Sequence, residues 1–181
     1  MRALGMIEVV SIPRGIKVAD EMLKAADVSL VAAQSVCAGK YIVLVSGSVS
    51  AVNASVEVGV NVADEKLVDS MNIANVDESV FAAMNAASEI VNPKAVGIME
   101  TFSLCAAVLA SDAAVKAANI QLIEIRLGRG LGGKSFIVLT GDVAAVKAAV
   151  KAAISLEETQ GLMSGSEVIP SPHEDVLQAI L

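Results

Sequence analysis

The stretch LGMIEVVSI (Leu4–Ile12) returns 92 residues later as VGIMETFSL (Val96–Leu104). A glycine, a glutamate and a serine keep their places in both copies, and apolar residues fill most of the remaining positions. A short apolar run of this kind predicts a buried strand. One strand therefore opens two copies of the same unit, and this internal repeat decides how the rest of the chain is interpreted.

Further segments recur in the same order. DEMLKAADVSLV (Asp20–Val31) returns as DAAVKAANIQLI (Asp112–Ile123) at the same shift of 92 residues. The Gly-Lys pair at 39–40 returns at 133–134, so the loop before it is two residues longer in the second copy. Pro93 interrupts the sequence between the copies, which predicts two domains, 1–92 and 93–181.

Each copy shows the order strand, helix, strand, strand, helix, strand, helix. The order predicts an α+β fold of two tandem ferredoxin-like units, each a four-stranded antiparallel sheet with helices. In the first copy we expect strands at Leu4–Ile12, 28–36, 41–46 and about 67–73, and a first helix at about 15–26. Ser48 is expected to cap the second helix. In the second copy, SPHE is expected to start the last helix, with Ser171 as its cap and Pro172 as its first residue.

Composition and charge exclude several classes of function. The chain has 181 residues, of which 2% are aromatic, and its net charge is −7. The chain has few aromatic rings on which bases could stack, and its negative charge repels phosphate, so nucleic acid is not an expected partner. Polar residues interrupt the apolar regions, so we expect neither a signal peptide nor a membrane span. The sequence contains no pair of carboxylates, no Cys–His arrangement and no nucleophile motif that would indicate an enzyme.

The second loop, GRGLGGKS (Gly128–Ser135), satisfies the letters of a phosphate-binding P-loop. That mechanism requires the loop to open into a helix, whose first amides hold the phosphates. Here Lys134 continues into SFIVLTG, a short β-branched run that predicts a strand. We therefore expect a strand–loop–strand hairpin and no nucleotide site.

Taken together, these motifs resemble the bacterial microcompartment shell domain. The resemblance rests on GMIEVVSI, DEMLKAADV, the loop ending in Gly-Lys, VLVSGSVSAV and the closing VIPSPHED, and it covers essentially the whole chain. Two fused units in this non-permuted order are similar to the tandem-domain shell proteins, which implies a homotrimer that imitates a hexagonal tile. The resemblance also implies that the two loops line a central pore, with pore-lining residues Val36, Cys37, Ala38, Gly39, Arg129, Gly130, Leu131 and Gly132.

Cys37 stands where one subclass of these tandem proteins, of the propanediol-utilisation type, has a cysteine before Pro-Gly-Lys. Ala38 takes the place of the proline. The resemblance implies one [4Fe-4S] cluster per trimer, held by three Cys37 thiolates, and iron–sulfur clusters do bind thiolates. The alternative is that Cys37 is a small apolar residue, as most free cysteines are. Cys105 lies in an apolar helix and is expected in the core, and His173 is expected to have a surface or interface role.

Lys24 and Lys116 each follow an aspartate by four residues on a predicted helix. This spacing indicates an ion pair along one helix face. The resemblance adds a second role, because the lysine of this motif lies at the tile edge in the family. Lys24 and Lys116 are therefore our predicted tile-edge residues.

These observations predict a structural shell tile in the bacterial cytoplasm, with a cluster for electron transfer or cluster exchange across the shell. Its expected partners are further shell proteins and a redox enzyme. Two alternatives stay open: a plain metabolite pore with a free thiol, and a regulatory trimer that binds a small molecule. The encapsulated pathway and the redox partner are not encoded in any motif of the chain.

Overall fold

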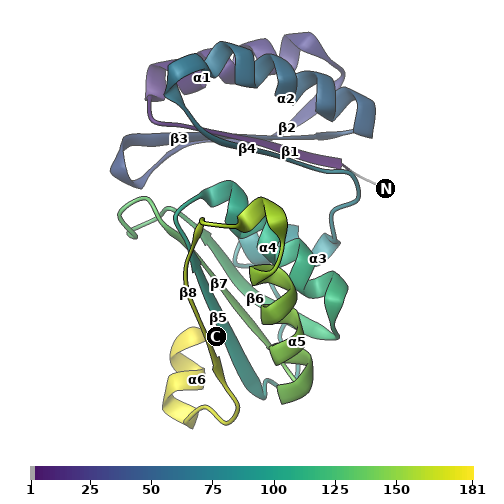
Figure 1. Cartoon of the computed structure of the whole chain (residues 1–181), viewed down its shortest axis with the longest axis vertical. Helices are drawn as coiled ribbons and strands as arrows, with labels where there is room; N and C mark the ends of the chain where they lie inside the picture. The colour runs from purple at the N-terminus through teal and green to yellow at the C-terminus, as the bar shows by residue number, and fades with distance from the viewer. Residues whose placement is uncertain (1–2) are drawn as a thin grey trace. The chain divides into compact units, whose positions relative to one another are not determined.

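The computed structural model describes residues 3–181, and the chain forms two compact units (Figure 1). Unit 1 comprises the described part of Met1–Val76 together with two short segments from farther along the chain, Ser103–Cys105 and Gly128–Gly133. Unit 2 comprises Asp77–Phe102, Ala106–Leu127 and Lys134–Leu181. Unit 1 therefore holds both loops that the sequence singles out.

Unit 1 contains a four-stranded antiparallel sheet in the order β2-β3-β1-β4. Helices α1 and α2 lie on one face of this sheet (Figure 1). The elements are β1 (Ala3–Val9), α1 (Ile12–Ala25), β2 (Val28–Val36), β3 (Lys40–Gly47), α2 (Val49–Ala63) and β4 (Leu67–Ile73). The predicted architecture is confirmed, and so is the cap of α2, because Ser48 Oγ accepts a hydrogen bond from the Ala51 amide at 3.2 Å.

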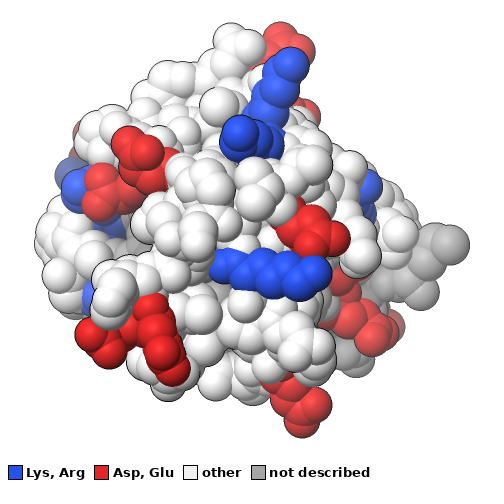
Figure 2. All heavy atoms as spheres, turned by 90° about the horizontal axis from the view of Figure 1, so that it is seen from below, with Lys and Arg blue, Asp and Glu red and all other residues white. Residues whose placement is uncertain are grey.

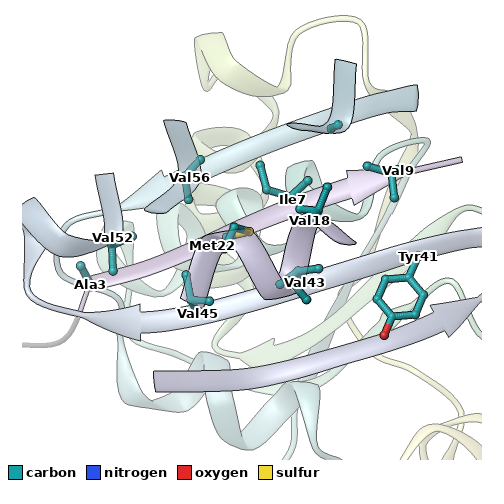
Figure 3. Close-up of a cluster of buried hydrophobic side chains, with 12 residues drawn as sticks. Ala3, Ile7, Val9, Val18, Met22, Tyr41, Val43, Val45, Val52 and Val56 are labelled. Atoms are coloured by element: carbon teal, nitrogen blue, oxygen red, sulfur yellow. The ribbon is translucent and has the colours of Figure 1, made fainter. Parts of the chain in front are cut away.

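The core of unit 1 fills the space between the helices and the sheet. Figure 3 shows side chains of both helices meeting those of β1 and β3. Ile7 and Val9 belong to this cluster. Because successive side chains of a strand point to opposite faces, Glu8, between them, lies on the face away from the helices. This alternation places a carboxylate on the second face of the sheet.

Unit 2 repeats the architecture, with a four-stranded antiparallel sheet in the order β6-β7-β5-β8. Helix α5 packs on β5, β7 and β8, and α3 packs on β6. The elements in this part of the chain are α3 (Glu78–Met84), β5 (Ala95–Thr101), α4 (Leu104–Ala117), β6 (Ile120–Leu127), β7 (Ser135–Gly141), α5 (Val143–Ile154), β8 (Met163–Ile169) and α6 (Glu174–Ile180).

The glycine that opens each repeat allows a helix to approach the central strand closely. A Cβ atom on Gly5 would lie 2.5 Å from a methyl group of Val56. A Cβ atom on Gly97 would lie 2.8 Å from Leu139 and 2.9 Å from Val150. Both distances are shorter than van der Waals contact, so the recurrence of this glycine follows from packing.

Two predicted helix starts are wrong. The first strand ends at Val9 and not at Ile12, and α1 begins at Ile12 and not near residue 15. Ser11 is the cap, since its Oγ accepts from the Arg14 amide at 3.3 Å, and the first turn tolerates the following proline. The last helix begins at Glu174, and its cap is His173, whose Nδ1 accepts from the Asp175 amide at 3.2 Å. Ser171 and Pro172 therefore precede the helix.

Candidate functional site

The first loop is a single turn of 3₁₀ helix, Cys37–Gly39, between β2 and β3. Ala38 has φ 62° and ψ 27°, and Gly39 has φ 72°. Two successive left-handed residues reverse the chain within three positions. The left-handed conformation is costly for alanine and is inaccessible to proline, whose ring fixes φ near −65°. The loop conformation seen here therefore depends on having no proline at position 38.

The second loop reverses the chain with glycines. Gly128, Gly130, Gly132 and Gly133 all have positive φ values, between 62° and 88°. A Cβ atom on Gly130 or Gly132 would meet nothing within 4 Å, so these glycines serve the backbone conformation and leave open space beside them. Strand β7 follows directly, which confirms that this segment is a hairpin and not a P-loop.

The two loops are hydrogen-bonded to each other within unit 1. The Cys37 amide donates to the Gly128 carbonyl at 2.9 Å, and the Gly130 amide donates to Cys37 Sγ at 2.9 Å. Arg129 donates from Nη2 to Gln34 Oε1 at 3.3 Å. The thiol is half-buried and its sulfur has a backbone N–H directed at it.

Among the predicted pore-lining residues, Val36 has the least exposed side chain and is 8% exposed. A Cβ atom on Gly128 would lie 3.1 Å from it, so Val36 supports the base of the loops. The other predicted residues are half-buried or exposed: Cys37, Ala38, Gly39, Arg129, Gly130, Leu131 and Gly132. The structure brings all eight together in unit 1, and their role in a pore stays a prediction.

A buried ion pair lies behind the first loop. Lys40 Nζ donates to Glu8 Oε1 at 2.6 Å, and the Glu8 side chain is fully buried. Glu8 Oε2 accepts from the Leu104 amide at 2.8 Å. Ser103 Oγ lies 3.4 Å from the same oxygen, and its hydroxyl donates to the closer Asp69 Oδ2. Leu104 is the first residue of α4, so the carboxylate also meets the positive end of a helix dipole. Lys40 also donates to the Gly133 carbonyl at 2.9 Å.

The second repeat contains the same pair in an open form. Lys134 Nζ donates to Glu100 Oε2 at 2.6 Å, with side chains 38% and 35% exposed. Ser164 Oγ donates to the same oxygen at 2.8 Å. The hydrogen bond from Lys134, followed by that from Ser164, holds the pKa of Glu100 below its ordinary value. Sequence reasoning missed both pairs, although the recurrence of a glutamate in an apolar strand and a lysine after each loop is a signal for them.

Cys105 is fully buried, as its apolar surroundings predict. Burial, with a smaller effect of the nearby Asp69 carboxylate, raises the pKa of its thiol well above the ordinary value. A thiol that stays protonated is not an iron ligand. The two cysteines are thus chemically distinct, and only Cys37 is available to a ligand.

Both predicted helix ion pairs form. Lys24 Nζ lies 2.5 Å from Asp20 Oδ2, with both side chains more than half exposed. Lys116 Nζ lies 2.5 Å from Asp112 Oδ2, and the Asp112 side chain is only 9% exposed. Asp112 Oδ1 also accepts from the Asp77 amide at 2.9 Å, just before α3. Lys24 is therefore the more accessible lysine, and the tile-edge role of both stays a prediction.

Unit 2 also contains a cavity of about 390 Å³, lined in part by β6 and β7. Arg126 lies over the Phe136 ring, 4.7 Å from its centroid, and binds Glu124 at 2.7 Å. Most of the other lining side chains are aliphatic, among them the C-terminal Ile180 and Leu181. The stacked arginine and the carboxylate already satisfy each other, so the cavity offers no unpaired charge to a ligand.

The charged side chains in view are dispersed. Figure 2 shows acidic and basic groups scattered among uncharged ones, without a broad basic patch on the face it presents. Within residues 3–181, none of the helices has the length and apolar character needed to cross a membrane.

The chain was compared with known proteins. The BMC domain matches it twice, at residues 3–76 and 95–172. The bacterial microcompartment shell protein PduT of Citrobacter freundii is 38% identical over 175 residues, which cover 97% of this chain and 95% of PduT. A microcompartment protein of Desulfitobacterium hafniense DCB, known from a crystal structure, is 46% identical, with a TM-score of 0.87 and coverage of 98% and 99% of the two chains.

The shell protein PduA of Citrobacter freundii matches only half of the chain. It is 42% identical over 84 residues, which are 46% of this chain and 87% of PduA. One repeat therefore corresponds to nearly the whole of that smaller protein. Because the domain match covers most of the sequence in two successive copies, this chain belongs to the BMC-domain family and contains two BMC domains in tandem.

Proposed function

We propose that this protein is a structural tile of a bacterial microcompartment shell, assembled as a homotrimer with a central pore that holds one [4Fe-4S] cluster. Family membership and the similarity to PduT over almost the whole of both chains support the shell role and the shell location within the cytoplasm. Two domains per chain and three chains give six similar units around one axis, which closes a ring. Its partners are other shell proteins and a redox enzyme, and the chain itself is not an enzyme.

The observation that carries the cluster proposal is the contact of Cys37. Its half-buried sulfur receives an N–H donor from Gly130 at 2.9 Å, as thiolate ligands of iron–sulfur clusters do. Among the described residues, one chain brings no three His, Cys, Asp or Glu side chains together for a metal. Three chains around an axis would supply three thiolates, which match three corners of a cubane cluster. When bound, the cluster supplies one-electron transfer.

The residues of the loops have separate roles in this proposal. Cys37 binds iron through its sulfur, and Gly130 orients that sulfur through its amide. Ala38 and Gly39 turn the chain so that β3 can begin directly behind the thiol. The buried pair of Glu8 and Lys40 fixes the base of the loop.

The test is anaerobic reconstitution with iron and sulfide, with a matched pair of variants. Wild type should acquire a broad visible absorbance and about four irons per trimer. Cys37→Ser should lose both while its free energy of unfolding barely changes, because a hydroxyl is a poor iron ligand and the side chain is half-exposed. Cys105→Ser should keep the cluster but lose about 1–3 kcal/mol of stability, because a hydroxyl replaces a fully buried thiol.

The comparison of the two variants separates the alternatives. Loss of the chromophore in the Cys105 variant and retention in the Cys37 variant would refute the cluster site. If a trimeric wild type never takes up iron, the protein is a plain metabolite pore. If the wild type is not a trimer in light scattering, the tile itself is refuted, and a small-molecule-binding regulatory protein becomes the better description.

The tile-edge proposal is tested on Lys24. Its side chain is 64% exposed and its partner Asp20 is 56% exposed, so Lys24→Glu leaves the fold unaffected. A carboxylate cannot donate the hydrogen bonds that an ammonium group makes, so this change at a contact repeated across the sheet should abolish extended sheets in electron microscopy and leave the trimer intact. Lys116→Ala is the better second variant, because an added carboxylate beside the nearly buried Asp112 would damage the fold. Unchanged sheets in both variants would refute the edge assignment.

A further inference from the structure

The starting observation is that the two repeats contain the same ion pair in two different states. In unit 1 the pair of Glu8 and Lys40 is enclosed by segments from farther along the chain. In unit 2 the pair of Glu100 and Lys134 is about one-third exposed. The two pairs occupy corresponding positions of the repeat, on corresponding strands, so we compare what covers each of them.

The cover of the first pair is known in atomic detail. The Leu104 amide, at the start of α4, donates to Glu8 Oε2 at 2.8 Å, and Ser103 Oγ, which donates to Asp69 Oδ2, lies 3.4 Å from the same Glu8 oxygen. The Gly133 carbonyl accepts from Lys40 at 2.9 Å. The cover thus consists of one helix N-terminus and one loop carbonyl, which match the negative and the positive member of the pair.

The first repeat contains residues equivalent to this cover, but within one chain they do not contact the pair of Glu100 and Lys134. By the repeat, Ser11 and Ile12 correspond to Ser103 and Leu104, and Gly39 corresponds to Gly133. Ile12 is the first residue of α1, so its amide has no acceptor within the helix. Lys134 and Ser164 both donate to Glu100 Oε2, and no donor among the described residues reaches its Oε1.

The apolar residues of the same helices show the same difference. Leu104 is fully buried in unit 1, whereas its counterpart Ile12 is 40% exposed. Val108 is fully buried, whereas its counterpart Ile16 is 56% exposed. Two isoleucines exposed one turn apart on a helix are typical of a surface that is covered in an assembly.

We propose that the Glu100–Lys134 pair is completed by a second copy of this chain, which inserts the start of its α1 and its first loop. The Ile12 amide of the second copy donates to Glu100, and the Gly39 carbonyl accepts from Lys134. Ser11 takes the place of Ser103. The hydroxyl of Ser103 donates to Asp69, and Gly165 stands at the corresponding position of unit 2, so the hydroxyl of Ser11 is left to donate to Glu100. The proposal deepens the trimer proposed above by naming the atoms that join successive chains.

A second pair of counterparts is consistent with this seam. Asp112 accepts from the Asp77 amide at 2.9 Å and is nearly buried. Their counterparts are Asp20, whose side chain is 56% exposed, and His173, the cap of α6. In the second copy, Asp20 is placed to accept from the His173 amide of its neighbour.

The experiment removes a single amide hydrogen. Ile12→Pro deletes the proposed donor, and proline is well tolerated at the first position of a helix whose preceding residue, Ser11, is already extended at φ −143°. Ile12→Ala is the matched control, because it removes the side chain but keeps the amide. Sedimentation over a range of protein concentrations gives the concentration at which half of the chains are assembled.

That concentration should be at least about tenfold higher for Ile12→Pro than for Ile12→Ala, because each seam loses a hydrogen bond to a charged group. Glu100→Gln should weaken assembly in the same direction with an unchanged circular dichroism spectrum, and this variant decides the matter if Ile12→Pro does not fold. A trimeric wild type whose assembly is unaffected by Ile12→Pro and by Glu100→Gln would overturn the seam and leave the trimer standing. A monomeric wild type would refute the proposed trimer itself.

Discussion

Removing the positive charge of Lys40 should destabilise the chain far more than removing that of Lys134. In Lys40→Met the Glu8 carboxylate stays fully buried and keeps the neutral Leu104 amide as its donor. Breaking a buried ion pair by removing one partner typically costs about 3–5 kcal/mol. In Lys134→Met of the unassembled chain, Glu100 is 35% exposed and water replaces the lysine, so the cost should stay below about 1 kcal/mol.

Urea unfolding followed by circular dichroism measures this difference. The midpoint should fall strongly for Lys40→Met with an unchanged dependence on urea concentration. Adding Glu8→Gln to Lys40→Met should recover part of the loss, because an amide oxygen can still accept from Leu104 and no charge remains buried. Measurements at several protein concentrations separate folding from assembly, since only the second depends on concentration.

Equal effects of the two lysine substitutions at the lowest protein concentration would refute this reasoning. The buried ion pair of Glu8 and Lys40 would then contribute no more to the free energy of unfolding than a surface ion pair does. A double variant less stable than Lys40→Met alone would also contradict it, because the buried charge would not be the source of the loss.

Two further predictions concern the first loop and the second cysteine. Ala38→Gly should raise the free energy of unfolding by roughly 0.5–1 kcal/mol in thermal or urea denaturation, because glycine adopts φ 62° without strain; no gain would mean that the strain is absent. The pKa of Cys105 is raised by burial, so its contribution to stability is complete below the unfolded value of about 9 and is lost as the pH rises above it. The stability of Cys105→Ala should therefore decline less between pH 8 and roughly pH 10 than that of wild type, in urea titrations at each pH.

The sequence predicts the fold well because the duplication repeats each signal. A single apolar run such as Leu4–Ile12 could be a strand or part of a helix, but its second copy, in the same order of elements, restricts the alternatives. The element order, the antiparallel sheets and the hairpin that contains the second loop are all confirmed. The exact ends of α1 and α6 were not predicted, because they depend on which of several capping residues the chain uses.

The ion pairs illustrate what single-sequence reasoning could not supply. Glu8 and Lys40 meet because β1 and β3 are paired in a register that sets Glu8 opposite Ile42. That register is a property of the folded sheet and not of either segment. The left-handed Ala38 was unpredictable for a different reason, because alanine rarely adopts this conformation without tertiary support.

Counted from the strand that precedes each loop, at the shift of 92 residues, Arg129 of the second loop stands at the position of Cys37 in the first. Six thiolates around one axis would exceed what a single cubane can bind, whereas three match three of its irons. In the proposed trimer, three guanidinium groups would then accompany three thiolates. Arg129 is exposed and is held by Gln34, and its neighbour Gly130 contacts the Cys37 sulfur. In the proposed trimer, the divergence of the two loops would thus pair a ligand with a compensating charge.

Removing that charge should lower the reduction potential of the proposed cluster. A nearby cation stabilises the reduced, more negative state, so Arg129→Gln should shift the potential to more negative values by an amount on the order of tens of millivolts. Redox titration of the reconstituted trimer, followed by electron paramagnetic resonance, measures the shift. Arg14→Gln is the control, because that guanidinium donates to the Val62 carbonyl at 2.7 Å, away from both loops. An equal shift in both variants, or none in Arg129→Gln, would show that the arginine has no electrostatic role at the thiolates.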